Sequence, residues 1–150
     1  MTALGLYEMH LNGKRVGDHQ LAPEFTDYNK RVQYQAYEVT DLVKEGENAI
    51  GGLLSSGWYC GHVAWTNEPY GTWPALYAQL EITFEDGTTQ TVTTDASWKT
   101  HASPILGADL LNGEIYDATK EIEGWSEAGL DDASWKPAIV REEDRNVVAQ

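Results

Sequence analysis

Strict alternation of apolar and polar side chains from Ala75 to Phe84 constrains the fold of this chain more than any other feature. The run reads ALYAQLEITF, and one face of it collects Leu76, Ala78, Leu80, Ile82 and Phe84. A period of two is typical of a half-buried β-strand, because successive side chains of a strand point to opposite faces. Asp86-Gly87 and the β-branched run TTQTVTT follow, so the sequence predicts a β-hairpin here.

Turn signals and short apolar runs predict further strands along the rest of the chain. A second hairpin is expected to start with a strand from Leu4 to His10 and to close through Asn12-Gly13, because both turn residues tolerate a positive φ angle. Other expected strands are Val32–Thr40 and Asn48–Leu54, with the polar turn DLVKEGEN between them and a third turn at Asn112-Gly113. No helical apolar stripe exceeds two turns, so the predicted class is all-β, as a β-sandwich or jelly roll.

The pentapeptide DASWK occurs twice, at Asp95–Lys99 and at Asp132–Lys136. Asp and Ser stabilise tight turns through their side chains, and we expect each Trp to fold back on the core. Two copies of five residues are too short for a repeat architecture, so they are interpreted as two similar turns. With 150 residues the chain has the length of one domain, predicted to span 1–140 and to be followed by a frayed tail or linker at 141–150.

The charge balance excludes two classes of partner. Ten basic and 24 acidic residues give a net charge of -14, whereas nucleic acids and anionic membrane surfaces both require a cationic footprint. No apolar run reaches the roughly 18 residues of a membrane span. Cys60 is the single cysteine and no signal peptide is visible at the start, so the compartment stays undetermined.

Aromatic residues gather in the connection between Leu54 and Ala75, which reads SSGWYCGHVAWTNEPYGTWP and is expected to lack regular structure. A long irregular loop usually has a function or its own packing, and the apolar face of a sugar ring stacks on aromatic side chains. The candidate carbohydrate-binding residues are Trp65, Tyr70 and Trp73 for stacking, with Asn67 and Glu68 as polar partners. Alternatively, the rings pack over the sandwich edge and hold the loop down, and Trp58 is the ring most expected to do so.

Other side chains give no catalytic site. Asp109, Glu114 and Asp117 bracket one turn, but close carboxylates are expected by chance among 24 acidic residues, so they are not assigned as a glycosidase pair. The four histidines lack zinc-like spacing, and Cys60 has no adjacent base. Calcium is left open as a ligand because its oxygen donors are plentiful, although no stretch matches an EF-hand loop. The chain is therefore not expected to be an enzyme by itself.

Five motifs together resemble the N-terminal domain of bacterial α-L-rhamnosidases, glycoside hydrolase family 78. They are LNGKRVGD, TDYNKRVQY at Thr26–Tyr34, GWYCG at Gly57–Gly61, YDA at Tyr116–Ala118 and GWSEAGLDDASWKPA at Gly124–Ala138. The matches cover most of residues 4–140. The element YEVT…GEN is less specific, since sugar-binding sandwich domains of the β-galactosidase and β-glucuronidase family carry something similar.

This resemblance implies a jelly-roll β-sandwich, like galactose-binding domains, that accompanies a separate catalytic (α/α)₆ barrel hydrolysing terminal α-L-rhamnose. One role left open is recognition or positioning of a rhamnose-containing glycan, since some relatives bind rhamnose with the help of calcium. A second is a structural domain that buttresses the catalytic barrel of the same polypeptide. The third is a sugar-binding domain of a β-galactosidase-like glycosidase.

The chain departs from the family pattern at two motifs and at its start. Glu24-Phe25 stands where the family usually has Gly-Trp, and Thr119 follows the YDA motif where the family has Arg; both changes weaken an inherited binding role. The family domain normally begins with strands upstream of Leu4, so residues 1–140 are expected to be missing their first strands. A sandwich without them exposes an edge, which favours dimerisation or strand exchange.

Overall fold

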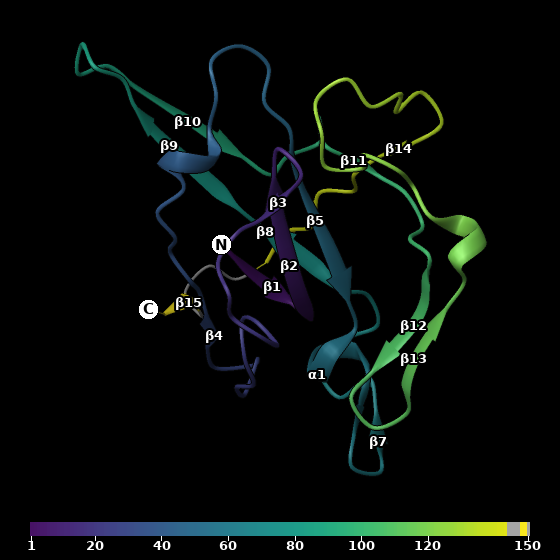
Figure 1. Cartoon of the computed structure of the whole chain (residues 1–150). Helices are drawn as coiled ribbons and strands as arrows, with labels where there is room; N and C mark the ends of the chain where they lie inside the picture. Colours follow the sequence, from purple (N-terminus) through teal and green to yellow (C-terminus); the bar gives the residue numbers. More distant parts are fainter. Residues whose placement is uncertain (144–147, 150) are drawn as a thin grey trace.

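The computed structural model describes residues 1–143 and 148–149, and within them the regular secondary structure consists almost entirely of short strands joined by long loops (Figure 1). The strands are β1 (Thr2–Leu4), β2 (Leu6–Leu11), β3 (Lys14–Arg15), β4 (Val32–Gln33), β5 (Ile50–Ser55), β6 (His62–Val63), β7 (Thr66–Asn67), β8 (Ala75–Tyr77), β9 (Gln79–Thr83), β10 (Thr89–Thr93), β11 (Lys99–Thr100), β12 (Ile105–Asp109), β13 (Gly113–Tyr116), β14 (Lys136–Pro137) and β15 (Val148–Ala149). The helical elements are α1 (Gly57–Cys60) and the 3₁₀ turns η1 (Thr40–Leu42) and η2 (Ala118–Lys120). The all-β prediction is confirmed.

The central sheet has the strand order β3-β2-β5, and within the described residues β2 supplies three of the seven buried residues of the main hydrophobic cluster, more than any other strand. Alternate residues of β2 point into the core, where Tyr7, Met9 and Leu11 are buried. The predicted hairpin is confirmed at the turn between β2 and β3, because Asn12 and Gly13 have φ angles of 52° and 79°. Such a pair of positive φ angles is what a tight two-residue hairpin turn requires.

A second layer of the β-sandwich packs against this face of β2. Strand β1 pairs with β8, β9 pairs with β10, and Ala3, Leu76 and Ala78 from this layer join the same hydrophobic core. The predicted strand from Ala75 to Phe84 is present, but it is divided at Ala78, whose backbone bonds to Thr94 instead of to the ladder. The alternation holds along β9, where Leu80 and Ile82 are half-buried, whereas Phe84, just beyond the end of the strand, is 47% exposed.

The expected strand Val32–Thr40 is wrong over most of its length, since only β4 forms a ladder. Gln35 exchanges two backbone hydrogen bonds with Met1 at 2.8 and 2.9 Å, and its side chain accepts one from the Tyr7 hydroxyl at 2.7 Å. These contacts tie the segment to β1 and β2, and residues 34–39 have no regular secondary structure. The 3₁₀ turn η1 overlaps the start of the polar turn expected at DLVKEGEN.

The two DASWK copies form similar turns and also lie next to each other. In each copy the backbone N–H of Trp donates to the backbone carbonyl of the Asp three residues earlier, at 3.2 Å for Trp98 and 3.0 Å for Trp135. The residues that follow the two Trp form β11 and β14, which pair with each other, and Lys99 forms an ion pair with Asp132 at 2.7 Å. Trp98 packs on the core as predicted, whereas Trp135 packs against His101.

The segment after Val140 contacts the body of the domain where it is described. The Arg141 guanidinium donates to the Tyr59 hydroxyl at 2.9 Å and to the Trp73 carbonyl at 3.2 Å. Of the tail expected at 141–150, residues 144–147 and 150 lie outside the described residues. Within the described part of the chain, no helix is long and apolar enough to cross a membrane.

Replacing Met9 with Ala tests whether β2 supplies the core. Met9 is 1% exposed, so we expect Met9→Ala to lower the free energy of unfolding by about 2–5 kcal/mol through lost burial and the cavity left behind. Urea denaturation followed by Trp fluorescence measures the change. Leu111→Ala is the control, because Leu111 is 61% exposed and its loss should change stability by less than about 0.5 kcal/mol. Equal effects of the two variants would contradict this assignment of the core.

Candidate functional site

The aromatic connection between β5 and β8 has regular structure, which corrects the expectation of a long irregular loop. It begins with the single helical turn α1, closed by N–H bonds from Cys60 to Ser56 and from Gly61 to Gly57 at 3.2 and 3.1 Å. Gly57 has a φ angle of 49°, and a Cβ atom there would lie 2.6 Å from the Leu6 side chain. The close packing of α1 on β2 therefore requires glycine at this position.

Tyr70 lies in an aromatic cluster that forms a second small core. Its ring is stacked on Tyr59 with centroids 6.4 Å apart and tilted against Tyr28 at 5.1 Å. Phe25 and Trp58 extend the cluster, with Phe25 packed on both Tyr28 and Trp58. Burial raises the pKa of Tyr28 to about 12. Tyr70 therefore packs within the protein, and the expectation that Trp58 has a structural role agrees with its place here.

Trp65, Asn67 and Glu68 lie together on or beside the β6–β7 hairpin, which projects beyond α1 (Figure 1). Trp65 is 100% exposed at the hairpin turn, next to Ala64, whose φ angle is 52°. Asn67 and Glu68 are also exposed, and the Glu68 N–H anchors the hairpin to the Gly61 carbonyl at 3.0 Å. These side chains are presented to solvent by a short, well-tied element.

Trp73 lies apart from that hairpin, on the segment that leads into β8. It is 77% exposed, and its carbonyl accepts a hydrogen bond from Arg141. The five residues predicted to bind carbohydrate thus occupy three environments: the hairpin, the aromatic cluster and the segment before β8. The structure groups Trp65 with Asn67 and Glu68, and it separates these three from Tyr70 and Trp73.

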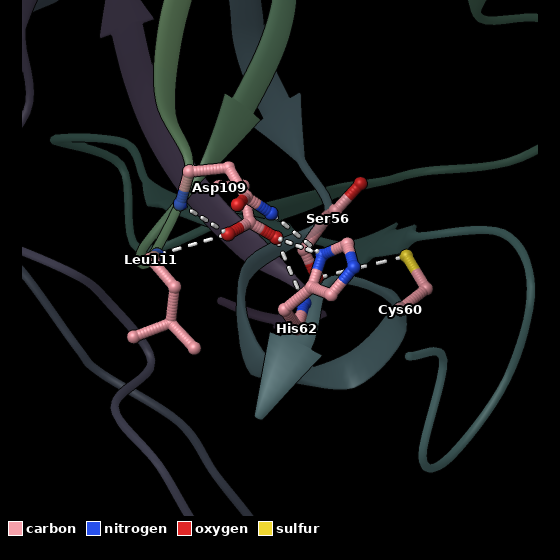
Figure 2. A network of polar contacts seen from close by, with 6 residues as sticks. Ser56, Cys60, His62, Asp109 and Leu111 are labelled. Atoms are coloured by element: carbon pink, nitrogen blue, oxygen red, sulfur yellow. Dashed lines mark hydrogen bonds and ion pairs between the residues drawn. The ribbon is translucent and has the colours of Figure 1, made fainter. Parts of the chain in front are cut away.

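A polar network that the sequence did not predict holds the β6–β7 hairpin against β12 (Figure 2). One carboxylate oxygen of Asp109 accepts from the backbone N–H of His62 at 2.8 Å and lies 3.0 Å from the His62 Nδ1 atom. Its other oxygen accepts from the N–H groups of Leu111 and Asn112 at 2.9 and 2.8 Å. Because 47 residues separate His62 from Asp109, no local pattern in the sequence predicts their contact.

Hydrogen bonding decides the charge state of Asp109. Burial by itself would raise the pKa of this carboxyl, but the N–H groups of Asn112, His62 and Leu111 and the His62 ring stabilise the carboxylate. The balance holds the pKa of Asp109 far below its usual range. Asp109 is therefore a fixed negative charge that fastens two hairpins together.

This network is a structural clamp and differs from a nucleophilic triad, although Ser56, Cys60 and His62 lie close together in Figure 2. The Cys60 thiol faces the Ser56 carbonyl at 3.6 Å, and burial raises the pKa of the thiol, which disfavours the reactive thiolate. Ser56 enters this contact only through its backbone carbonyl.

The carboxylates around the Asn112-Gly113 turn have separate partners. Asp117 accepts from the Thr119 N–H at the start of η2, and Glu114 lies exposed on β13 opposite Ala108. Asp109 is occupied by the clamp. Among residues 1–143 and 148–149, no cluster of three or more His, Cys, Asp or Glu side chains is arranged to hold a metal ion.

A large open cavity lies between the central sheet and the segments that carry β11, β12 and β14. Its volume is about 3140 Å³, and all six residues of β5 and all five residues of β12 line it. Many of the exposed apolar side chains of the described residues face it. They are Leu21, Leu54, Trp73, Tyr77, Leu106, Leu110, Ile139 and Val140.

Acid titration of an Asp109 variant tests the clamp. Since the folded pKa of Asp109 lies below the unfolded value of about 3.9, its carboxylate stabilises the fold above that value, and the stabilisation is lost as the pH falls toward the folded pKa. We expect Asp109→Asn to lower the free energy of unfolding by about 1–3 kcal/mol at pH 7 and by progressively less below pH 4. Glu114→Gln is the control, because Glu114 lies exposed on β13 of the same hairpin and is not part of the clamp. A difference between Asp109→Asn and the unmodified protein that stays constant from pH 7 to pH 2 would contradict the clamp.

Comparison with known proteins places the whole chain in one family. The family model for the alpha-L-rhamnosidase N-terminal domain matches residues 1–150. An alpha-L-rhamnosidase of Streptomyces avermitilis is 51% identical over 150 residues, which are 99% of this chain and 14% of that protein. An alpha-L-rhamnosidase of Alteromonas is 42% identical over 142 residues, or 93% of this chain and 15% of the relative.

Solved structures give the same result. The crystal structure of the Streptomyces avermitilis alpha-L-rhamnosidase complexed with L-rhamnose matches 98% of this chain with a TM-score of 0.91 and 51% identity. That of the native Aspergillus terreus enzyme matches 99% with a TM-score of 0.96 and 38% identity. These matches cover 14% and 18% of the two solved chains, so the present chain corresponds to a small part of each enzyme. Because the family model spans every residue, this chain belongs to the alpha-L-rhamnosidase N-terminal domain family.

Proposed function

We propose that this chain is a non-catalytic accessory domain of an α-L-rhamnosidase and that it docks against the rest of the same polypeptide, which includes the catalytic (α/α)₆ barrel. In this proposal the intact enzyme hydrolyses terminal α-L-rhamnose, and residues 1–150 supply no catalytic group. The family match favours an α-L-rhamnosidase over a β-galactosidase-like parent.

The main support for a docking role is the size and the lining of the cavity. Pockets for small molecules usually have volumes of about 300–1,000 Å³, whereas this cavity has about 3140 Å³. A monosaccharide would leave most of it filled with water. Ile139 and Leu106 are 94% and 52% exposed on its wall, and clustered exposed apolar side chains are typical of surfaces that another protein segment covers.

The polar groups of the domain support an accessory role. Asp109, the carboxylate with the most strongly shifted pKa, is fully engaged in joining two hairpins. The buried Cys60 thiol is held in its neutral form. A pair of facing carboxylates suited to glycoside hydrolysis is not formed by Asp109, Glu114 and Asp117, each of which has different surroundings.

Trp65 supports a second candidate role, in which the β6–β7 hairpin contacts a rhamnose-containing glycan. Its indole is wholly exposed, and the exposed Asn67 and Glu68 side chains offer hydrogen-bonding groups on the same hairpin. An exposed aromatic ring with polar neighbours suits the apolar face and the hydroxyls of a sugar. Tyr70 and Trp73 do not share this surface, so the candidate site reduces to three of the five predicted residues.

Paired measurements on the isolated chain and the intact enzyme test docking. The double variant Leu106→Asp with Ile139→Asp should change the unfolding free energy of the 150-residue chain by less than about 0.5 kcal/mol, because both side chains are already exposed. In the intact enzyme it buries two charges, so we expect its thermal midpoint to fall by at least several degrees. Phe84→Asp is the control, since Phe84 is 47% exposed and lies outside the cavity lining.

Hydrolysis assays complete the test of this proposal. The intact enzyme should cleave an aryl α-L-rhamnoside, whereas the isolated chain should not. Cleavage by the isolated chain, or an unchanged midpoint of the intact double variant, would contradict the accessory docking role.

An NMR titration of the isolated chain with L-rhamnose tests the second role. If the hairpin binds sugar, the Trp65 indole N–H signal and the Asn67 backbone amide signal shift and saturate, and galactose and glucose fail to reproduce these shifts. Trp65→Ala should then abolish the shift at the Asn67 amide, which the variant retains. Trp73→Ala is the matched control, because Trp73 lies on a different segment. Running the titration once with calcium and once with a chelator shows whether binding requires the metal. Spectra that do not change at high millimolar L-rhamnose would eliminate this role for the isolated domain.

A further inference from the structure

Strand β5 is an edge strand that opens onto the cavity. In the described part of the chain it pairs only with β2, and all six of its residues line the cavity wall. Its sequence, Ile-Gly-Gly-Leu-Leu-Ser, contains no charge and no proline. Natural edge strands are normally protected from pairing by charged side chains, proline or bulges, and β5 has a regular six-residue register without any of them.

The pairing register shows which backbone groups of β5 remain free. The Asn12 N–H donates to the Ala49 carbonyl at 2.9 Å, so hydrogen-bonded pairs alternate from this point along the antiparallel ladder. Residues 51, 53 and 55 then bond to β2, while the N–H and C=O groups of Ile50, Gly52 and Leu54 point away from it. The hydrogen bonds of β2 confirm this pattern. Tyr7 and Met9 are the residues opposite Leu54 and Gly52, and the Tyr7 N–H and the Met9 carbonyl bond to Ala22 and Val16, on the side of β2 away from β5.

The outward backbone groups of β5 have no protein partner among the described residues. Gly52 is half-buried, and within the described residues no hydrogen bond reaches the backbone of β5 from any strand other than β2. Partly buried N–H and C=O groups without protein partners are unfavourable, and an added strand satisfies a whole row of them at once. The exposed apolar side chains of the cavity lining, among them Leu54 and Leu106, favour an occupant that brings apolar side chains of its own.

From these observations we infer that a β-strand from outside residues 1–150 of the same polypeptide adds to the free edge of β5 and fills part of the cavity. This inference rests on the proposed function, which makes the chain one domain of a larger enzyme. In the relatives, the region that matches this chain is only 14–18% of the whole protein. The cavity is large enough for a strand with alternating apolar side chains beside β5. A second copy of this chain is the competing occupant, and the test below separates the two.

Amide hydrogen exchange of β5 provides the test, because neighbouring residues act as matched controls. In the isolated 150-residue chain, Gly51 and Leu53 amides should be protected by β2, whereas Gly52 and Leu54 amides should exchange at least tenfold faster. In the intact enzyme, Gly52 and Leu54 should reach the protection of their neighbours. Fast exchange at Gly52 and Leu54 in both proteins would overturn the inference. Protection in the isolated chain that rises with protein concentration would also overturn it, because it identifies a second copy as the occupant.

Proline substitution gives an independent test. Leu54→Pro removes an N–H that β2 does not use. In the isolated chain, the thermal midpoint of this variant should therefore lie within a few degrees of that of Leu54→Ala, the control that also lacks the leucine side chain. In the intact enzyme the proline blocks the added strand, and its midpoint should fall clearly below that of Leu54→Ala. Equal midpoints of the two variants in the intact enzyme would contradict strand addition. If the intact enzyme cleaves rhamnosides but shows neither the added protection nor the proline effect, the strand proposal fails and the proposed function stands. If Gly52 and Leu54 gain protection in an intact protein that does not cleave rhamnosides, the strand proposal stands and the proposed function fails.

Discussion

The ladder between β2 and β5 is the interaction on which the rest of the domain depends, and the Asn12 side chain fixes its register. The Asn12 amide donates to the Leu42 carbonyl at 2.9 Å and to the Asn48 side chain at 2.7 Å, and its oxygen accepts from the Ala49 N–H at 2.9 Å. One residue thus closes the hairpin turn and holds the start of β5. With the register set, Met9 and Leu11 face the core, while the outer edge of β5 faces the cavity.

Features set by short-range chemistry were predictable from the sequence. Asn12-Gly13 and Asp86-Gly87 each close a hairpin as expected, because the residues that tolerate positive φ determine such turns locally. The turn expected at Asn112-Gly113 is also present, and it joins the paired strands β12 and β13. The alternating run that forms β8 and β9 was also predicted. The expectation for Val32–Thr40 was wrong because Gln35 takes its backbone partners from Met1, and nothing within that segment indicates this distant contact.

The candidate site was predictable only in part, for the same reason. Composition identified the aromatic connection, but it does not distinguish Tyr70, packed on Tyr28 and Tyr59, from Trp65, fully exposed at a hairpin turn. Exposure depends on which segments meet in space. The clamp through Asp109 and the cavity beside β5 likewise arise from contacts between residues far apart in sequence, and one chain without its relatives carries no signal for them.

The paired DASWK turns show how a small local unit can be reused within one domain. Both copies close the turn with a backbone hydrogen bond from Trp to Asp, and in the first copy the Ser97 hydroxyl also donates to the Asp95 side chain. The pentapeptide therefore adopts the same conformation at both places. The surroundings then decide the use of each indole: Trp98 donates to the Thr93 carbonyl at 3.1 Å, and Trp135 packs on His101. Such a unit behaves as an interchangeable part, because two copies of it bring two matching strands together without requiring a new hydrophobic core.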